Sequence, residues 1–268
     1  MTTRAVVLAR GLGTRMRQTD ATAQTTGAQA AIAATGIKAL IPIDRPFLDY
    51  GLSALADAGI TDVCLVIGPE HDAVRRHYRD TVPRRLRLAF AVQAEPSGTA
   101  DAVLAAERWT AGQPFLAINS DNYYPVAALE RLVRLEEPGL VGFTRAGLLN
   151  DGLIEPARIA RFGIVEADAD DRLVRVLEKP DPRVLAAADA DALVSMNCWR
   201  FDARIFEACR QVPRSERGEH ELPQAVQLAL QLGVAFRTVR FSGGVLDLSS
   251  RADISNVTAR LRGVEVRL

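Results

Sequence analysis

The sequence predicts an α/β fold in which a largely parallel sheet is covered by helices on both faces. Through the first 145 residues, short apolar runs rich in β-branched residues alternate with segments of helical periodicity. Strands that alternate with helices in this way are typical of parallel sheets. The chain has 268 residues, of which 48% are hydrophobic and 25% charged, and it is therefore long enough to bury a substantial core.

The expected elements of the first half follow a regular order. Strands are expected over residues 4–9, 62–68, 86–93, 115–119 and 139–145. Helices are expected between them, over residues 46–59, 71–80, 99–109 and 126–137. In the first of these helices Leu48, Leu52 and Leu55 fall on one face, as a helix that covers a sheet requires.

After residue 150 the rhythm changes. The remaining predictions are two strands within 158–180 around a turn at Asp168–Arg172, helices near 202–212 and 221–232, and a strand at 235–241.

The domain organisation follows from what separates these two parts. No Pro- or Ser-rich linker divides them, so we expect a single domain over residues 1–268 whose two halves divide at about residue 150. No hexapeptide repeat is present near the C-terminus, and we therefore expect no β-helix appendage.

Residues 16–37 differ from their surroundings. They are small and polar without clear periodicity. This composition favours a mobile loop, which could act as a lid; the alternative is a tolerated surface insertion.

Composition and charge exclude several classes of protein. Lys plus Arg and Asp plus Glu each number 33, so no strong net field attracts nucleic acid or an anionic membrane. The three cysteines show no CxxC spacing, which argues against a disulfide framework or a zinc site. The apolar run at residues 5–9 is too short for a signal peptide or a membrane span, and a cytoplasmic protein is expected.

The strongest motif is LARGLGTRMR at residues 8–17. An apolar strand runs into glycines, which let the backbone turn tightly and bring N–H groups to phosphate oxygens. Thr14 can add a hydroxyl donor, and Arg15 can clamp phosphate with its forked guanidinium. Met16 stands where a dinucleotide fingerprint needs a third glycine, and a P-loop lysine is absent. A purely structural turn is the other interpretation.

Three polar residues are further candidates. Gln93 ends an expected strand and offers both a donor and an acceptor to a base. Asp121 follows another strand, where α/β sheets commonly bind ligands, and its carboxylate suits magnesium. Asp247 lies among apolar residues, which is unusual for an unpaired charge. Each of the first two has a structural alternative. The segment after Gln93 could simply start a helix capped by Ser97 or Thr99, and Asp121 could be an ordinary turn residue.

Taken in order, these segments resemble the sugar-1-phosphate nucleotidyltransferase family. The similarity extends over nearly the whole chain and includes GIKALIPIDRPFLDYGLSAL, QAEPSGTADAVLAAE, FLAINSDNYYP, FGIVEADADDRLVRVLEKP and GGVLDLSS. Ala39 replaces the usual proline after Lys38, Arg10 replaces a small residue, and serines replace glycines at 120 and 249. The resemblance implies a Rossmann-like three-layer α/β/α fold of the nucleotide-diphospho-sugar transferase type, with a mostly parallel mixed central sheet. It also implies a nucleotide-binding half over about 1–150 and a sugar-phosphate-binding (acceptor) half over about 151–268.

The resemblance also implies a role for each matching residue. Arg15 and Lys38 would be catalytic, although Lys38 could also be a solvated surface lysine. The nucleotide would contact Ala9, Gly11, Leu12, Gly13, Thr14, Gln93, Gly98 and Thr99. The sugar phosphate would contact Gly163, Glu178, Lys179 and Asn197, unless 162–180 is a plain hairpin ending in an exposed ion pair. Asp121 and Asp247 would hold Mg²⁺.

The implied reaction joins a nucleoside triphosphate to a sugar 1-phosphate by direct displacement and releases pyrophosphate. UTP or dTTP is favoured over the other triphosphates, and a homo-oligomer is left open. Two alternatives remain at this point: a regulatory relative that binds nucleotide sugars without turnover, and a metal-dependent glycosyltransferase.

Overall fold

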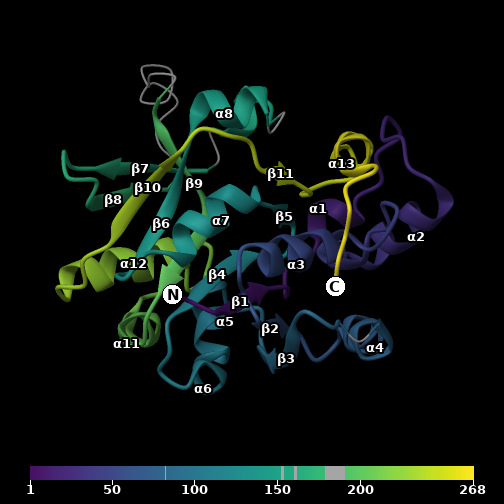
Figure 1. Ribbon diagram of the computed structural model, residues 1–268. Coiled ribbons are helices and arrows are strands. Elements are labelled where there is room, and N and C mark those ends of the chain that lie inside the picture. The colour runs from purple at the N-terminus through teal and green to yellow at the C-terminus, as the bar shows by residue number, and fades with distance from the viewer. Residues whose placement is uncertain (82, 152–153, 160–161, 179–190) are drawn as a thin grey trace.

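The computed structural model describes residues 1–81, 83–151, 154–159, 162–178 and 191–268 (Figure 1). Its centre is one mixed sheet with the strand order β10-β6-β9-β4-β1-β2-β3, and β7 and β8 extend it beside β9. Residues from both halves of the chain therefore build the same sheet. The expected α/β fold with a mostly parallel mixed sheet is confirmed.

The parallel part of the sheet comes from the first half of the chain. Strand β1 (Arg4–Leu8) lies between β2 (Asp62–Ile67) and β4 (Phe115–Asn119), and β3 (Arg87–Val92) follows β2. All these neighbours pair in parallel. Their carboxyl ends consequently meet at one edge, which is where the candidate site lies.

The antiparallel strand β9 (Leu193–Phe201) is the element that makes the sheet mixed. It lies between β4 and β6 (Gly139–Thr144), and β10 (Arg237–Phe241) pairs with β6. Nothing in the sequence analysis anticipated this strand. Its fully buried Trp199 stacks on Phe201 with 5.6 Å between ring centroids, so this tryptophan is part of the core.

The second half begins with a hairpin that the sequence predicted. Strands β7 (Gly163–Ala167) and β8 (Leu173–Leu177) pair in antiparallel fashion around the expected turn. Three helices that follow β6 were not expected: α8 (Arg145–Asn150), α9 (Pro156–Ile159) and α13 (Asp253–Leu261).

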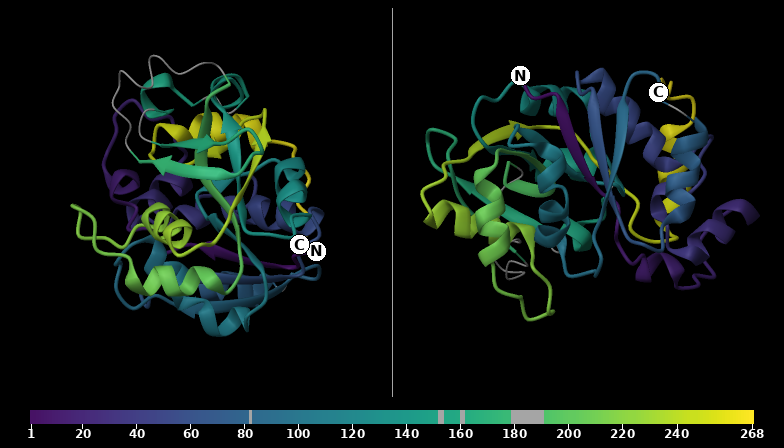
Figure 2. Two further views of the ribbon diagram at one scale, coloured as in Figure 1. Left: turned by 90° about the vertical axis from the view of Figure 1, so that its left-hand side faces the viewer. Right: turned by 90° about the horizontal axis from the view of Figure 1, so that it is seen from below.

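Helices cover both faces of the sheet (Figure 2). On one face the apolar sides of α3 (Phe47–Asp57), α4 (Asp72–Thr81) and α7 (Val126–Val133) pack into one core cluster. On the other face α5 (Thr99–Ala105), α11 (Arg204–Gln211) and α12 (Leu222–Gln231) form a second cluster. The expected helix over 99–109 is broken at Ala106, after which α6 (Glu107–Thr110) starts.

The expectation of a mobile loop over residues 16–37 is wrong for the parts of this segment that form helices. Residues Thr14–Arg17 form α1, and Gly27–Thr35 form α2. Thr26 and Gln29 make a capping box at the start of α2, and this pair stabilises the helix where hydrophobic periodicity is weak. Ala33 is buried in a third cluster with residues of α3 and α13, so α2 is fastened to the body of the protein.

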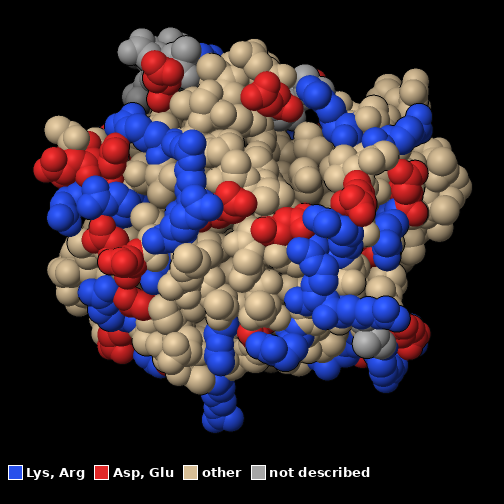
Figure 3. Space-filling view, viewed as in Figure 1, with Lys and Arg blue, Asp and Glu red and all other residues tan. Residues whose placement is uncertain are grey.

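The surface carries charges of both signs. On the face in Figure 3, acidic and basic side chains are interspersed. Exposed pairs such as Arg175–Glu166 and Arg240–Asp171 contribute little stability each. Within the described residues, no helix is long and apolar enough to cross a membrane, and no β-helix follows α12.

Candidate active site

A cavity of about 290 Å³ opens at the carboxyl ends of the parallel strands. It is lined by residues from the Gly-rich loop, from the 310 helix η1 (Lys38–Leu40) and from the ends of β3 and β4. Eight of the predicted site residues line it: Ala9, Gly11, Leu12, Lys38, Gln93, Gly98, Thr99 and Asp121. One space therefore unites four segments that are far apart in the sequence.

The Gly-rich loop owes its path to Gly13. This residue adopts φ +62°, and a Cβ atom there would lie 2.2 Å from the carbonyl oxygen of Gly36. Only glycine permits so close an approach of the loop to the end of α2. Thr14 and Arg15 are exposed on α1, and neither is among the described residues that line the cavity. Buried Met16 anchors the same turn.

The orientation of Gln93 is fixed by its partners. Its Nε2 donates to the Gly98 carbonyl at 2.9 Å and to Asp101 Oδ2 at 2.8 Å. A carbonyl accepts only, and so does an ionised carboxylate, so both amide hydrogens are used and Oε1 is left as the group that can accept from a ligand. The sequence analysis expected Gln93 to offer a base both a donor and an acceptor. In the structure it can offer only the acceptor Oε1.

The turn after Gln93 packs against the second half of the chain. Gly98 has φ +113°, and a Cβ atom there would lie 2.4 Å from the carbonyl oxygen of His220. The Thr99 hydroxyl accepts from the Leu222 N–H at 2.9 Å. Thr99 therefore serves the start of α12, and neither it nor Ser97 caps α5, whose N-cap is Gly98 without a side-chain bond.

Arg10 and His71 are among the cavity residues to which the sequence analysis gave no role. Arg10 is buried, and its Nη2 donates to Ala94 O at 3.0 Å and to Glu70 at 3.3 Å. His71, which received no role, also lines the cavity, and burial lowers its pKa. Arg10 stands where the family usually has a small residue. It therefore adds a bulky, positively charged side chain to the cavity wall near Glu70 and Ala94.

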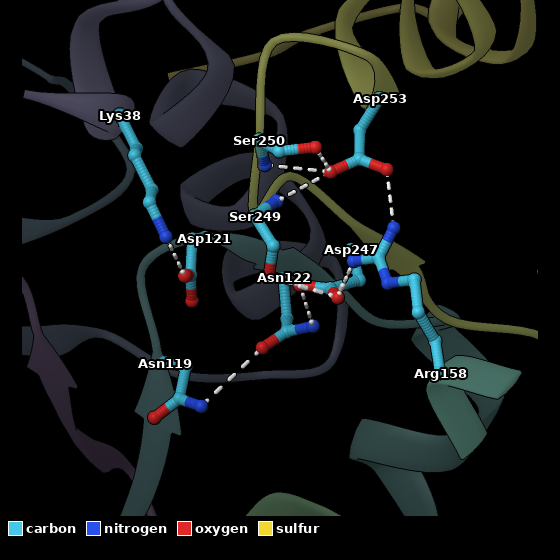
Figure 4. Close-up of polar contacts among 9 residues, drawn as sticks. All are labelled: Lys38, Asn119, Asp121, Asn122, Arg158, Asp247, Ser249, Ser250 and Asp253. Atoms are coloured by element: carbon cyan, nitrogen blue, oxygen red, sulfur yellow. Dashed lines mark hydrogen bonds and ion pairs between the residues drawn. The ribbon is translucent and has the colours of Figure 1, made fainter. Parts of the chain in front are cut away.

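A small two-stranded sheet brings the two candidate metal ligands together. Strand β5 (Asn122–Tyr123) pairs with β11 (Leu246–Asp247), and the N–H of Leu248 donates to the carbonyl of Asp121 at 2.8 Å. Asp247 thus lies in β11, and Asp121 directly precedes the strand with which β11 pairs (Figure 4). Burial, together with the nearby charge of Asp121, raises the pKa of Asp247 to about 6, against the influence of Arg158.

Each of these carboxylates has a cationic partner. Lys38 Nζ donates to Asp121 Oδ2 at 2.9 Å, and the Arg158 guanidinium binds both Asp247 and Asp253 (Figure 4). Ser249 Oγ also donates to the Asp247 carboxylate, at 2.9 and 3.0 Å to its two oxygens. The serine that replaces the family glycine at 249 therefore supports the carboxylate.

These two carboxylates fit magnesium. Mg²⁺ usually binds one or two carboxylates and completes its shell with water and substrate phosphates. No group of three or more metal-binding side chains occurs among the described residues, so substrate oxygens would have to supply much of the shell.

The residues expected at the sugar phosphate lie around β7 and β9. A Cβ atom on Gly163 would lie 2.7 Å from Val176 and 2.9 Å from Glu178 Oε1, so the glycine makes room for that carboxylate. Asn197 has φ +53°, and its Oδ1 accepts from Trp199 Nε1 at 3.3 Å. Lys179 lies outside the described residues.

Tyr124 connects these strands to the acidic site. Tyr124 follows Asp121 by three residues in the sequence. Its hydroxyl lies within hydrogen-bond distance of the carbonyl oxygens of Met196, at 2.7 Å, and Asn197, at 3.4 Å, and donates to them.

The arrangement defines a class: an α/β protein with a Gly-rich loop and two aspartates at the carboxyl edge of its sheet, as in enzymes that act on nucleotides. Residues 4–258 match the sequence model of the family described as "Nucleotidyl transferase", and the chain belongs to that family.

The chain is similar to several proteins of known name. It is 32% identical over 256 residues to a glucose-1-phosphate thymidylyltransferase of Streptomyces antibioticus, covering 95% of this chain and 65% of that protein. It is 26% identical to the UTP–glucose-1-phosphate uridylyltransferase AglF of Haloferax volcanii, covering 96% of each. The chain thus spans less than two thirds of the thymidylyltransferase and almost all of AglF.

Solved structures agree on the fold. A UDP-glucose pyrophosphorylase in complex with UDP-glucose superimposes with a TM-score of 0.73 at 16% identity, covering 97% of this chain and 99% of that one. A UTP-bound UGPase from Acinetobacter baumannii gives 0.72 at 18% identity, covering 99% and 96%.

The sequence analysis missed the polar residues that surround Asp247. Asn122, Arg158 and Asp253 received no role, yet each takes part in its network. A signal existed for Asn122, which follows Asp121 directly. None existed for Arg158, because its contacts join segments that are distant in the sequence.

Proposed function

We propose that the protein transfers a nucleotidyl group from a nucleoside triphosphate to a sugar 1-phosphate, giving a nucleotide sugar and pyrophosphate. The observation that carries this proposal is the shared cavity, which is lined by the Gly-rich loop, Lys38, Gln93 and Asp121 together. Family membership supports it, as do the named activities of the relatives.

The nucleotide would lie along this cavity. The base would sit near Gln93 and Gly98, and the triphosphate would run past Gly11 toward Lys38 and Asp121. Backbone N–H groups of a Gly-rich turn suit phosphate oxygens, which favours this direction. Arg15, on the exposed first turn of α1, would reach the leaving phosphates from outside.

The reaction needs no protein nucleophile. A phosphate oxygen of the sugar 1-phosphate attacks the α-phosphorus, a new P–O bond forms, and the bond to the β-phosphate oxygen breaks with its electron pair leaving on pyrophosphate. Magnesium held by Asp121 and Asp247 would supply positive charge to the phosphate oxygens. The residues of the chain contribute positioning and charge neutralisation, chiefly through Lys38 and Arg15.

The acceptor would bind between the hairpin and β9. Glu178 would accept hydrogen bonds from sugar hydroxyls beside Gly163, and Asn197 would lie at the ring. Lys179 would balance the sugar phosphate. The contact of Tyr124 with Asn197 supports a sugar site next to the acidic centre.

The base is most readily a uracil or a thymine. Because Gln93 keeps only an acceptor for a ligand, it favours a base that presents a ring N–H. Uracil and thymine do so at N3, and the two named relatives use uridylyl and thymidylyl groups.

The test is a matrix of five nucleoside triphosphates against a panel of sugar 1-phosphates, read by pyrophosphate release with Mg²⁺ present. We expect release with UTP or dTTP and at least one hexose 1-phosphate, and we expect Asp121→Asn to abolish it. Nucleotide-sugar binding without release would identify a regulatory relative instead. Transfer of sugar from a nucleotide sugar to an acceptor would identify a glycosyltransferase.

A further inference from the structure

Arg158 is a cation placed at the second candidate metal ligand. It lies on the short helix α9, and its side chain is 20% exposed. One Nη atom binds Asp247 and the other binds Asp253 (Figure 4). The guanidinium therefore spans two carboxylates, one from β11 and one from α13.

Three side chains donate to the Asp247 carboxylate in this arrangement. An ionised carboxylate offers about four lone-pair positions. Ser249 Oγ lies within hydrogen-bond distance of both oxygens, Asn122 Nδ2 lies 3.5 Å from Oδ1, and Arg158 binds Oδ2. A divalent cation that binds Oδ2 meets the Arg158 guanidinium, a like charge, on the same oxygen, and the two cations repel each other.

Asp253 shows why Arg158 is the partner that can move. Its Oδ2 accepts from the N–H groups of Ser249 and Ser250, at 3.0 and 2.6 Å, so its own position is held by backbone. If the bond to Asp247 breaks, the guanidinium is still anchored by Asp253. Replacement of Arg158 by a cation at Asp247 would therefore break one ion pair and leave the Arg158–Asp253 pair in place.

We propose that Arg158 and a divalent cation compete for the Asp247 carboxylate, with Arg158 as the positioning residue that holds it when the metal is absent. The proposal rests on the proposed function only in taking Asp247 as a metal ligand. Asp121 differs, because its carboxylate is 25% exposed, lines the cavity and pairs with a lysine on one oxygen. The first metal contact therefore forms at Asp121, and the second requires displacement of Arg158.

The experiment measures Mn²⁺ binding to the full chain without substrates, by the electron paramagnetic resonance signal of free Mn²⁺. Arg158→Ala removes the competitor, and we expect Mn²⁺ to bind about tenfold more tightly, the order found for close charge pairs. Arg158→Gln, which keeps the side-chain length, should show the same direction if Arg158→Ala fails to fold. Thermal melting checks the fold of each variant.

Two controls separate competition from a general charge effect. Arg175→Ala removes the same charge from an exposed pair with Glu166, and it should change Mn²⁺ affinity less than about twofold. In an Asp247→Asn background, Arg158→Ala should have no effect.

Unchanged or weaker Mn²⁺ binding in Arg158→Ala overturns the proposal, since it would make Arg158 a structural support of Asp247. A gain that persists in the Asp247→Asn background overturns it as well. Absence of Mn²⁺ binding in all variants overturns the competition and the metal site together. Pyrophosphate release, measured separately, decides the proposed function independently of these results.

Discussion

Lys38 and Asp121 form an ion pair across the mouth of the cavity, with 2.9 Å between Nζ and Oδ2. The lysine comes from η1, just after α2, and the aspartate follows β4. Lys38 is thus joined to the acidic centre in the free protein. A triphosphate that enters the cavity offers the lysine a second anionic partner, so the pair is positioned to open when the nucleotide binds.

The first prediction concerns this lysine. Lys38→Met should lower kcat by roughly 10²-fold, because in the proposed function it removes one charge that would face the leaving phosphates. The free energy of unfolding should change by less than about 1 kcal/mol, since partly exposed pairs contribute little. Steady-state kinetics and urea unfolding measure the two quantities, with Arg134→Ala as a surface control. Unchanged kcat would exclude Lys38 from the reaction.

Arg15 should affect turnover more than nucleotide binding. Backbone N–H groups of the loop remain in any side-chain variant, whereas in the proposed function the guanidinium would act where charge builds up on pyrophosphate. Arg15→Ala should reduce kcat by ~10²–10³ with little change in the Kd of the triphosphate. Arg15→Lys should restore only part of the rate, because an ammonium cannot span two oxygens. If affinity falls in proportion to rate, Arg15 is a binding group only.

Gln93 should discriminate between bases by their hydrogen-bond pattern. Uracil, thymine and guanine present a ring N–H to its oxygen, whereas adenine and cytosine present a ring acceptor. We expect calorimetric Kd values for ATP and CTP at least about tenfold weaker than for UTP or dTTP, the effect of one unmatched hydrogen bond. Gln93→Ala, checked by melting for an intact fold, should lose this preference. Equal Kd values for all five triphosphates would contradict the assignment.

Residues 17–37 should gain protection from hydrogen exchange when a nucleotide binds. Gly36 and Ile37, next to α2, line the cavity directly. Contact with a ligand there should slow opening of the last turn of α2 and raise its protection. Mass spectrometry of exchanged peptides, with and without nucleotide, measures this change, and peptides of α11 serve as the reference. Identical exchange in both states would show that the segment does not act as a lid.

The three thiols should be inert in the folded protein. Burial raises the pKa of Cys64 and of Cys209 to about 12, and it also raises the pKa of Cys198. A raised thiol pKa leaves almost no thiolate at pH 8, and thiolate is the reactive form. Ellman's reagent should therefore modify native protein at least about 10²-fold more slowly than protein in denaturant. Rapid reaction of one native thiol would contradict this packing.

Much of the fold could be predicted because its strands are apolar runs and its early helices are amphipathic. Strand β9 escaped notice because Ser195, Asn197 and Arg200 interrupt its pattern, although it is buried on both faces. Helix α2 escaped because its alanines give no clear periodicity. Its capping box, Thr26 with Gln29, was the readable signal.

Some residues of the candidate site could also be predicted from the sequence, and others could not. Residues that follow strands directly, such as Gln93 and Asp121, could be found because a parallel sheet gathers its strand ends. Asp247 was found as a charge among apolar neighbours. Arg158 could not be found, because its importance depends on the distance to Asp247 and Asp253, which only the tertiary structure sets.

The pairing of β5 with β11 has a consequence for the synthesis of the protein on the ribosome. Asp121 leaves the exit tunnel early, together with the strands that shape the nucleotide cavity, whereas Asp247 follows only after another 126 residues (247 − 121) have been added. A nascent chain can thus form its central parallel strands long before Asp247, the second candidate metal ligand, has been synthesised. Under the proposed function, the second metal ligand arrives only when β11 docks, so an unfinished chain should not consume nucleotide.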